Sequence, residues 1–245
     1  MTAIHEQYAS EMRQEFGYLA AWLPGTAIAL GDIGVLRGTR FESLTSLSAL
    51  GVDFASQPMR AVGDLEYASA GQVDVEWHGR GGLLGGAGAE GGVTVSFKRS
   101  NAIFFQASGC VTGTMADLPT VEQALIGMDK ERWRRDWAVV TEVVVARSAA
   151  VIISSRSGGR LDLRLQGGGG GASLAELASR LRIASEAGIA ARVLTASGLT
   201  PLFRVCQLRG GVVRRMTLVY RGEGQVAGAR SGSGVGSLDE EKSPQ

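Results

Sequence analysis

The sequence predicts an α+β fold, with a twisted, mainly antiparallel β-sheet and three or four helices. Two observations predict the sheet. Polar and apolar residues alternate strictly in several segments, and residues 137–153 are rich in valine and isoleucine. A third observation predicts helices, because apolar residues recur at helical spacing in residues 3–19 and 173–188.

Composition sets bounds on domain organisation and function. The chain has 245 residues, of which 44% are hydrophobic and 20% charged, and its formal net charge is +1. It is long enough to bury a core, and the balanced charge disfavours a nucleic-acid-binding protein. Many of the 36 glycines lie in clusters at 79–92, 167–171 and 222–236. We therefore expect one α+β domain over residues 1–221, followed by a disordered tail at 222–245.

Cysteine usage and the N-terminus indicate the compartment. The two cysteines, Cys110 and Cys206, do not form a disulfide framework, so we expect free, buried thiols in a reducing cytosol. The N-terminal residues carry charges throughout and contain no apolar signal-peptide core, and no run of 18 apolar residues predicts a transmembrane helix. The expected location is cytoplasmic.

The predicted elements begin with an amphipathic helix at 3–19. Its apolar stripe is formed by Ile4, Tyr8, Met12 and Phe16. We expect this helix to dock on the domain, with a membrane-surface or partner-binding helix as the alternative. Short strands at 27–30 and 33–36 and a turn of helix at 46–50 follow.

The next segments predict a long β-hairpin. Residues 72–78 alternate, with Val73, Val75 and Trp77 on one face. A glycine-rich connection at 79–92 leads into residues 93–107, which again have strand character.

A helix and a second hairpin are predicted next. The helix begins near Pro119 and ends in the charged segment 130–136. The strand at 137–153, a turn at 155–159 and the alternating residues 161–165 then predict a hairpin of the same design as the first.

The C-terminal region predicts a helix and several strands. Ser173 and Glu176 match a capping box, and Gly188 is placed to end a helix over residues 173–188. Strands are expected at 189–196, 202–208 and 212–220.

No motif predicts catalysis, a metal site or a cofactor site. His5 and His78 lack metal-ligand spacing, and Cys110 has no evident histidine partner. The glycine loop at 79–92 lacks the Lys-Ser/Thr of a phosphate-binding loop and precedes a strand, where such a loop precedes a helix. We therefore expect a non-enzymatic protein without cofactors. A hydrolase whose site residues are distant in sequence, around His78 or Cys110, is a third and weaker option.

Three segments resemble the pore-forming domain of bacterial gasdermins, in an order that extends from Val73 to Leu208. They are the glycine-rich entry into Val93–Lys98 with its continuation 101–106, the strand 137–143 with its VVTEV string, and the segment 201–208. The resemblance covers a little over half of the chain. The lipidated cysteine that bacterial members carry near the N-terminus is absent, since the first cysteine is Cys110. Residues 1–70 do not match the opening of that family.

The resemblance implies a gasdermin N-domain-like fold and a function. Members stay soluble until a protease removes an inhibitory part; two hairpins then extend into a membrane and assemble a large pore. It implies a cell-death or antiviral-defence effector that moves from the cytoplasm to the inner membrane, with membrane lipid, an activating protease and its own copies as partners. The membrane-inserting residues would be Val93, Val95, Phe97, Phe104, Val139, Val143, Val145, Ile152, Leu161 and Leu163. Lipid headgroups would contact Lys130, Arg132, Arg134 and Arg135.

The residues also leave a different reading open. Segments 93–107 and 137–165 are long enough for transmembrane strands. Residues 143–145 and 149–153, however, are apolar on both faces, which suits a strand between two layers of a soluble fold. A soluble regulatory or scaffold module without membrane activity is therefore the alternative function.

Overall fold

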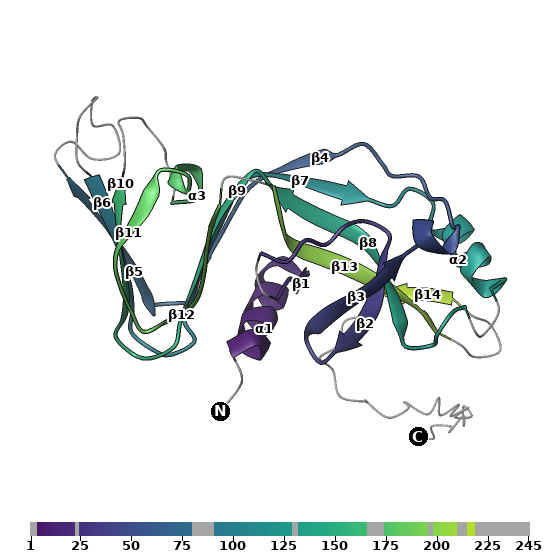
Figure 1. The fold of residues 1–245 in the computed structure, drawn as a ribbon, viewed down its shortest axis with the longest axis horizontal. Coiled ribbons are helices and arrows are strands. Elements are labelled where there is room, and N and C mark those ends of the chain that lie inside the picture. The colour runs from purple at the N-terminus through teal and green to yellow at the C-terminus, as the bar shows by residue number, and fades with distance from the viewer. Residues whose placement is uncertain are drawn as a thin grey trace, which may run out of the picture.

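The computed structural model describes residues 4–22, 25–79, 91–128, 132–165, 174–195, 198–209 and 215–218. Within them the fold is α+β, as predicted, with all strands paired antiparallel in a ten-stranded and a four-stranded sheet (Figure 1). The helices are α1 (Ile4–Phe16), α2 (Leu118–Ile126) and α3 (Leu174–Leu177), with a 3-10 turn at Ser48–Leu50.

One part of the larger sheet, here called the body, packs on α2. It consists of β1 (Leu19–Ala20), β2 (Asp32–Arg37), β3 (Arg40–Ser46), β8 (Trp137–Ala146), β13 (Leu199–Arg209) and β14 (Arg215–Leu218). Val140, Phe203 and Val205 fill one body core, and Val121, Leu125 and Val139 fill another.

Four further strands of the larger sheet, here called the stalk, lead away from the body. They are β4 (Arg60–Ala68), β7 (Ile103–Thr114), β9 (Ser148–Ser154) and β12 (Ile189–Thr195), and they pair in the order β4-β7-β9-β12. The smaller sheet, here called the distal sheet, contains β5 (Val73–Gly79), β6 (Gly91–Phe97), β10 (Gly159–Leu165) and β11 (Leu181–Ala187), in the order β5-β6-β10-β11.

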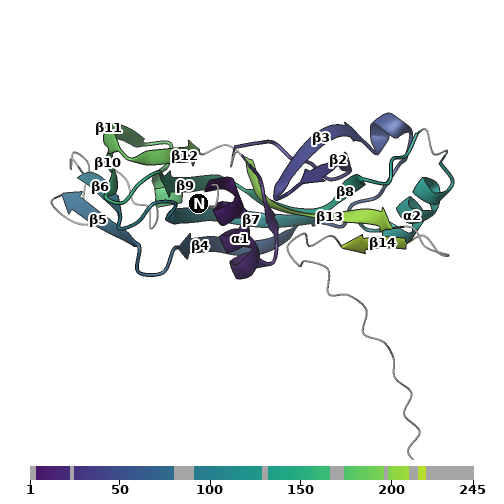
Figure 2. The same ribbon diagram turned by 90° about the horizontal axis from the view of Figure 1, so that it is seen from below.

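The two orders match strand by strand. The chain passes from β4 into β5, from β6 into β7, from β9 into β10 and from β11 into β12. Stalk and distal sheet are therefore one four-stranded ribbon that is folded back on itself, as the V-shaped arrangement in Figure 1 shows. Figure 2 shows the same strands from below. We call the four bends the joints.

The ribbon corrects the predicted second hairpin. The first hairpin was placed correctly around residues 79–92, although joints divide both of its arms. The second was wrong, because 137–165 does not form a hairpin: β8 and β9 both pair with β7, and β10 joins the distal sheet. The actual second hairpin runs from β9–β10 into β11–β12 and encloses the five glycines at 167–171.

The predicted helix at 173–188 was also wrong. Only Leu174–Leu177 are helical, and β11 begins at Leu181. Leu174, Leu177 and Leu181 do share one core, as the predicted stripe required, but pairing with β10 decides that the last of them lies in a strand. Gly188 has φ 64° and lies at a joint, so it does not cap a helix.

Most of the remaining predictions agree with the structure. The helix at 3–19 and the strands at 189–196 and 202–208 are confirmed, and the strand at 212–220 is confirmed over Arg215–Leu218. Two predictions were wrong: residues 27–30 form no strand, and residues 132–136 form a loop beyond α2 instead of a helix end. The glycine connections at 80–90 and 167–171 and the tail at 222–245 lie outside the described residues.

The stalk is the middle layer of three. Ile103, Phe105, Val151 and Ile153 face α1 in one core, which includes Tyr8 and Met12 of the helix. The intervening Phe104 and Ile152 face the distal sheet and α3 in a second core. Every residue of β9 is buried for this reason, which accounts for the segment at 149–153 that is apolar on both faces.

Candidate functional site in the folded ribbon

The fold of the ribbon buries an apolar surface between its two layers. Side chains of the distal strands β6 and β10 meet side chains of the stalk strands β7 and β9, and α3 completes the core. Seven residues predicted to insert into a membrane lie together here: Val93, Val95, Phe97, Phe104, Ile152, Leu161 and Leu163. Val139, Val143 and Val145 lie apart from them in the body.

The apolar face of the distal sheet continues to both of its edges. Val75 and Trp77 of β5 pair with the buried Val95 and Val93, yet they are 36% and 39% exposed. Ile183 of β11, opposite Leu163, is 42% exposed. An apolar surface that is covered at its centre therefore reaches solvent along two edge strands.

The opposite face of the distal sheet is polar. Asp162 of β10 is its centre, accepting hydrogen bonds from Thr94 (2.6 Å), from Ser185 (2.5 Å) and from Arg160 (3.0 Å). His78 extends the row to β5 through a 2.9 Å contact between its Nε2 and Thr94 Oγ1. Each strand of the distal sheet thus contributes at least one side chain to the polar row. The residues next to it along the strand point to the apolar face, because side chains alternate between the two faces of a strand.

The polar row strongly lowers the pKa of Asp162. Hydrogen bonds from Arg160, then from Ser185 and Thr94, hold the pKa of Asp162 well below its ordinary value. The carboxylate therefore stays ionised and fixed at neutral pH.

Each joint of the ribbon contains one residue in the left-handed backbone region. These residues are Gly71, Asn101, Gly158 and Gly188, with φ between 59° and 72°. Asn101 is the only non-glycine residue with positive φ in the described part of the chain. A left-handed residue reverses the course of a strand locally, so these four positions define the bend.

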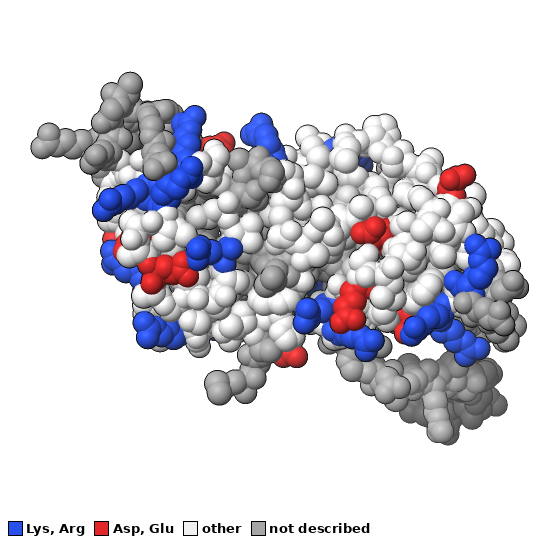
Figure 3. Space-filling model, viewed as in Figure 1, with Lys and Arg blue, Asp and Glu red and all other residues white. Residues whose placement is uncertain are grey.

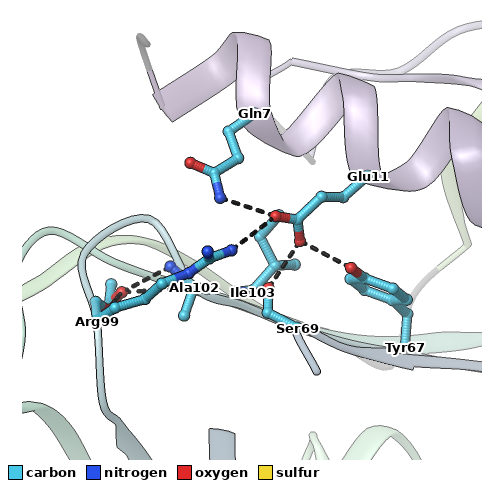
Figure 4. A network of polar contacts seen from close by, with 8 residues as sticks. Gln7, Glu11, Tyr67, Ser69, Arg99, Ala102 and Ile103 are labelled. Atoms are coloured by element: carbon cyan, nitrogen blue, oxygen red, sulfur yellow. Dashed lines mark hydrogen bonds and ion pairs between the residues drawn. The ribbon is translucent and has the colours of Figure 1, made fainter. Parts of the chain in front are cut away.

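Glu11 of α1 connects the helix to the joints of the first hairpin (Figure 4). Its carboxylate accepts hydrogen bonds from Tyr67 Oη (2.9 Å) and Ser69 Oγ (2.7 Å), at the end of β4. It also pairs with Arg99 (3.2 Å), between β6 and β7, and only 13% of the Glu11 side chain is exposed. Gln7 donates a further hydrogen bond at 2.8 Å.

Three of the four predicted headgroup residues lie in the loop beyond α2, at the end of the molecule away from the distal sheet (Figure 1). Arg132, Arg134 and Arg135 are exposed, and Lys130 lies outside the described residues. Arg134 pairs with Asp136 at 2.8 Å, and Arg132 donates to the carbonyl of Leu50. Basic side chains lie at both ends of the face shown in Figure 3, with acidic ones nearby at each end.

The two cysteines lie in surroundings that do not activate a thiol. Cys110 and Cys206 are free and buried, as predicted. Burial raises the pKa of Cys110 to about 11 and also raises the pKa of Cys206, the opposite of what activates a nucleophile. No cluster of metal-ligating side chains occurs within the described residues. Among the helices of that same part, none is both long and apolar enough to cross a bilayer.

The predicted turn at 155–159 is confirmed as the joint between β9 and β10. Sequence reasoning missed the other three joints and the Glu11 cluster. Gly71 and Gly188 stood next to predicted strands, which was the available signal. Nothing in the sequence linked Glu11 to Tyr67, Ser69 and Arg99, because those residues are 56 to 88 positions away.

Comparison with known proteins gives little further information. No family model matches the chain, and no curated protein matches it. Among solved structures, the gasdermin A3 membrane pore, determined by cryo-electron microscopy, is similar over 91% of this chain and 97% of that one, at 11% identity and a TM-score of 0.37. A TM-score of this size is too low for the likeness to support an assignment of family or function.

Proposed function

We propose that the protein is a non-enzymatic, gasdermin-like effector that permeabilises membranes, stays soluble while its ribbon is folded, and serves in cell death or defence. One observation carries the proposal: two neighbouring hairpins are each folded back at their joints, so that the apolar face of the distal sheet covers the apolar face of the stalk. In this state the apolar surface is stored inside the protein. The resemblance of the sequence to bacterial gasdermins supports the same function.

The distal strands have the pattern that a membrane-spanning strand requires. Such strands need about 9–11 residues that alternate between lipid and a polar interior. Each distal strand has seven described residues and continues at its joint into a stalk strand of seven or more. A straightened ribbon therefore has the required length. The row from Ser185 to His78 provides the polar face.

On this proposal the partners are membrane lipid, further copies of the chain and an activating protease. The folded protein resides in the cytoplasm and moves to the inner membrane when activated. Arg132, Arg134 and Arg135 provide cationic contacts for anionic headgroups.

Val75, on the edge strand β5 of the distal sheet, allows a direct test. Val75→Lys should leave the folded protein intact, because Val75 is already 36% exposed. In a membrane the same side chain faces lipid, where a lysine costs about 2–4 kcal/mol near the midplane. The protein, intact or with its tail trimmed by protease, should release dye from anionic vesicles, and Val75→Lys should reduce the rate at least about tenfold.

Glu76→Lys is the matched control, because it lies next to Val75 on the polar face and adds even more positive charge. It should retain leakage close to wild type. If neither the intact nor any trimmed form of the wild type releases dye, the proposal fails.

A soluble interaction module is the second candidate, favoured by the exposed apolar side chains on the edge strands β5 and β11. Edge strands with such side chains can accept a strand of another protein. A stable soluble complex that Val75→Lys disrupts, without any vesicle leakage, would support this function instead.

A further inference from the structure

We propose that the four joints form a hinge line and that Glu11 of α1 is the latch that keeps the ribbon folded. As an account of how membrane activity is restrained, this inference rests on the proposed function. The hinge and the latch themselves can be measured without any membrane.

Hydrogen bonds connect the joints into one row across the ribbon. Lys98 donates its backbone N–H to Gln72 O (2.9 Å), which joins the first bend to the second. Asn101 N–H donates to Ser154 O (3.0 Å) and links the second bend to the third. Ser155 N–H then donates to Gly188 O (2.8 Å) at the fourth. Because neighbouring joints are bonded to one another, the four strands are expected to bend or straighten together.

The bend depends on left-handed backbone at each joint. A strand that runs straight through a joint needs extended φ, so straightening requires these four residues to change conformation. For glycine the two conformations are almost equal in energy, whereas side chains other than Asn and Asp disfavour the left-handed one. Three glycines and one asparagine at these positions therefore allow both the folded and the straight ribbon.

Glu11 holds the row of joints from the face of the stalk that packs on α1, opposite the face that the distal sheet covers. Through Ser69 it fixes the end of β4, and through Arg99 it fixes the loop between β6 and β7. The same two residues connect further into the joints: Ser69 Oγ also accepts from Ile103 N–H (3.0 Å), and the Arg99 carbonyl accepts from Ser154 Oγ (2.8 Å). One partly buried carboxylate thus joins α1 to three of the four bends (Figure 4).

The Glu11 contacts imply a way in which the folded ribbon is released. When α1 leaves the stalk, Glu11 and its partners lose their mutual hydrogen bonds, and the joints keep only the hydrogen bonds that they make among themselves. The apolar core between the stalk and the distal sheet is then the main remaining restraint on straightening. Lipid can take the place of the stalk against the apolar face of the distal sheet. A contact that removes α1 from the stalk would thereby favour insertion.

The latch is tested by amide hydrogen exchange of the full-length protein in solution. In Glu11→Ala, the joint amides of Lys98, Asn101 and Ile103 should exchange at least about tenfold faster than in wild type. Amides in β8 and β13 of the body should stay within about twofold. Glu15→Ala removes the same charge from an exposed position on the same helix, and its joint amides should match wild type.

Arg99→Gln is the second variant, for the case that Glu11→Ala does not fold. It removes the ion pair but keeps the carbonyl bond to Ser154, and should also accelerate the joint amides selectively. Unchanged joint exchange in the folded variants, or equal acceleration in the body strands, would overturn the latch.

The hinge is tested at two joints where a side chain has room. A Cβ at Gly71 or Gly158 meets nothing within 4 Å, so Gly71→Val and Gly158→Val act only through backbone conformation. Gly38→Val is the control, because Gly38 has the same left-handed φ and open surroundings in the β2–β3 turn. The joint variants should raise joint exchange about tenfold and shorten the lag before vesicle leakage, and the control should do neither.

The outcomes separate the two proposals. Faster joint exchange in Glu11→Ala without leakage from any form supports the latch and refutes the membrane function. Leakage by the wild type with no difference between Glu11→Ala and Glu15→Ala, in leakage or exchange, supports the membrane function and refutes the latch.

Discussion

At the scale of single residues, the role of a side chain in the ribbon depends on which of its two faces the side chain lies on. Asp162 and Leu163 are neighbours, yet one centres a polar row and the other enters the apolar core. Alternation predicted this division for β5, β6 and β10, but not for β11, which was predicted as a helix. It could not predict that Asp162 would meet Thr94 and Ser185, because those partners come from separate strands whose register is set by the assembled sheet.

Asp162 should make the stability of the protein depend on pH. Because its folded pKa is depressed, its contribution is present above the unfolded pKa, near 3.9, and is lost as pH falls toward the folded value. Asp162→Asn should lower the free energy of unfolding at pH 7 by about 1 kcal/mol, after allowance for partial exposure. Urea unfolding at pH 7 and at pH 3 should show this difference shrinking at the lower pH.

Asp74→Asn provides the comparison, since it makes the same change on β5, where Asp74 pairs with Lys98 at the surface. Its effect should stay below about 0.5 kcal/mol. Equal effects of both substitutions, or a constant difference between pH 7 and pH 3, would contradict the role given to Asp162.

At the scale of elements, the segment 173–188 shows how packing overrides local preference. Its capping box and leucine spacing favour a helix, but helices of this length depend on tertiary contacts in water. In the fold, β10 offers a strand partner from Arg160 to Leu165, and the chain takes it after a single turn of helix. The same leucines reach the same core in either arrangement, so their pattern could not distinguish the two.

The short α3 should nevertheless be important for stability, because it closes the core between the layers. Leu177 is 2% exposed and packs in that core. Leu177→Ala should lower the free energy of unfolding by about 2–5 kcal/mol, measured by urea titration. Leu44→Ala, at a position that is 53% exposed, should change it by less than about 1 kcal/mol. Near-equal effects would mean that α3 does not cover the ribbon.

At the scale of the whole molecule, the body and the ribbon are expected to respond differently to a membrane. Trp77 is 39% exposed on the distal sheet, whereas Trp133 in the body is 7% exposed. Anionic vesicles should shift tryptophan emission to shorter wavelength as Trp77 enters lipid. Trp77→Phe should abolish most of that shift while the protein still binds vesicles. A full shift in Trp77→Phe would assign the change to another tryptophan and contradict insertion of the distal sheet.

The sequence by itself determined much of the strand content, the amphipathic pattern of residues 72–78, 93–98 and 161–165, and the absence of an obvious chemical motif. These properties follow from residue type and short-range periodicity, which act over a few positions. The sequence did not predict β4, and it assigned β11 to a helix. Only the tertiary structure decided that β8 and β10 belong to different sheets, that the ribbon folds at Gly71, Asn101, Gly158 and Gly188, and that Glu11 holds that fold. Those features depend on pairings between distant segments, because the choice among possible strand partners is made by the burial and backbone hydrogen bonds of the assembled chain.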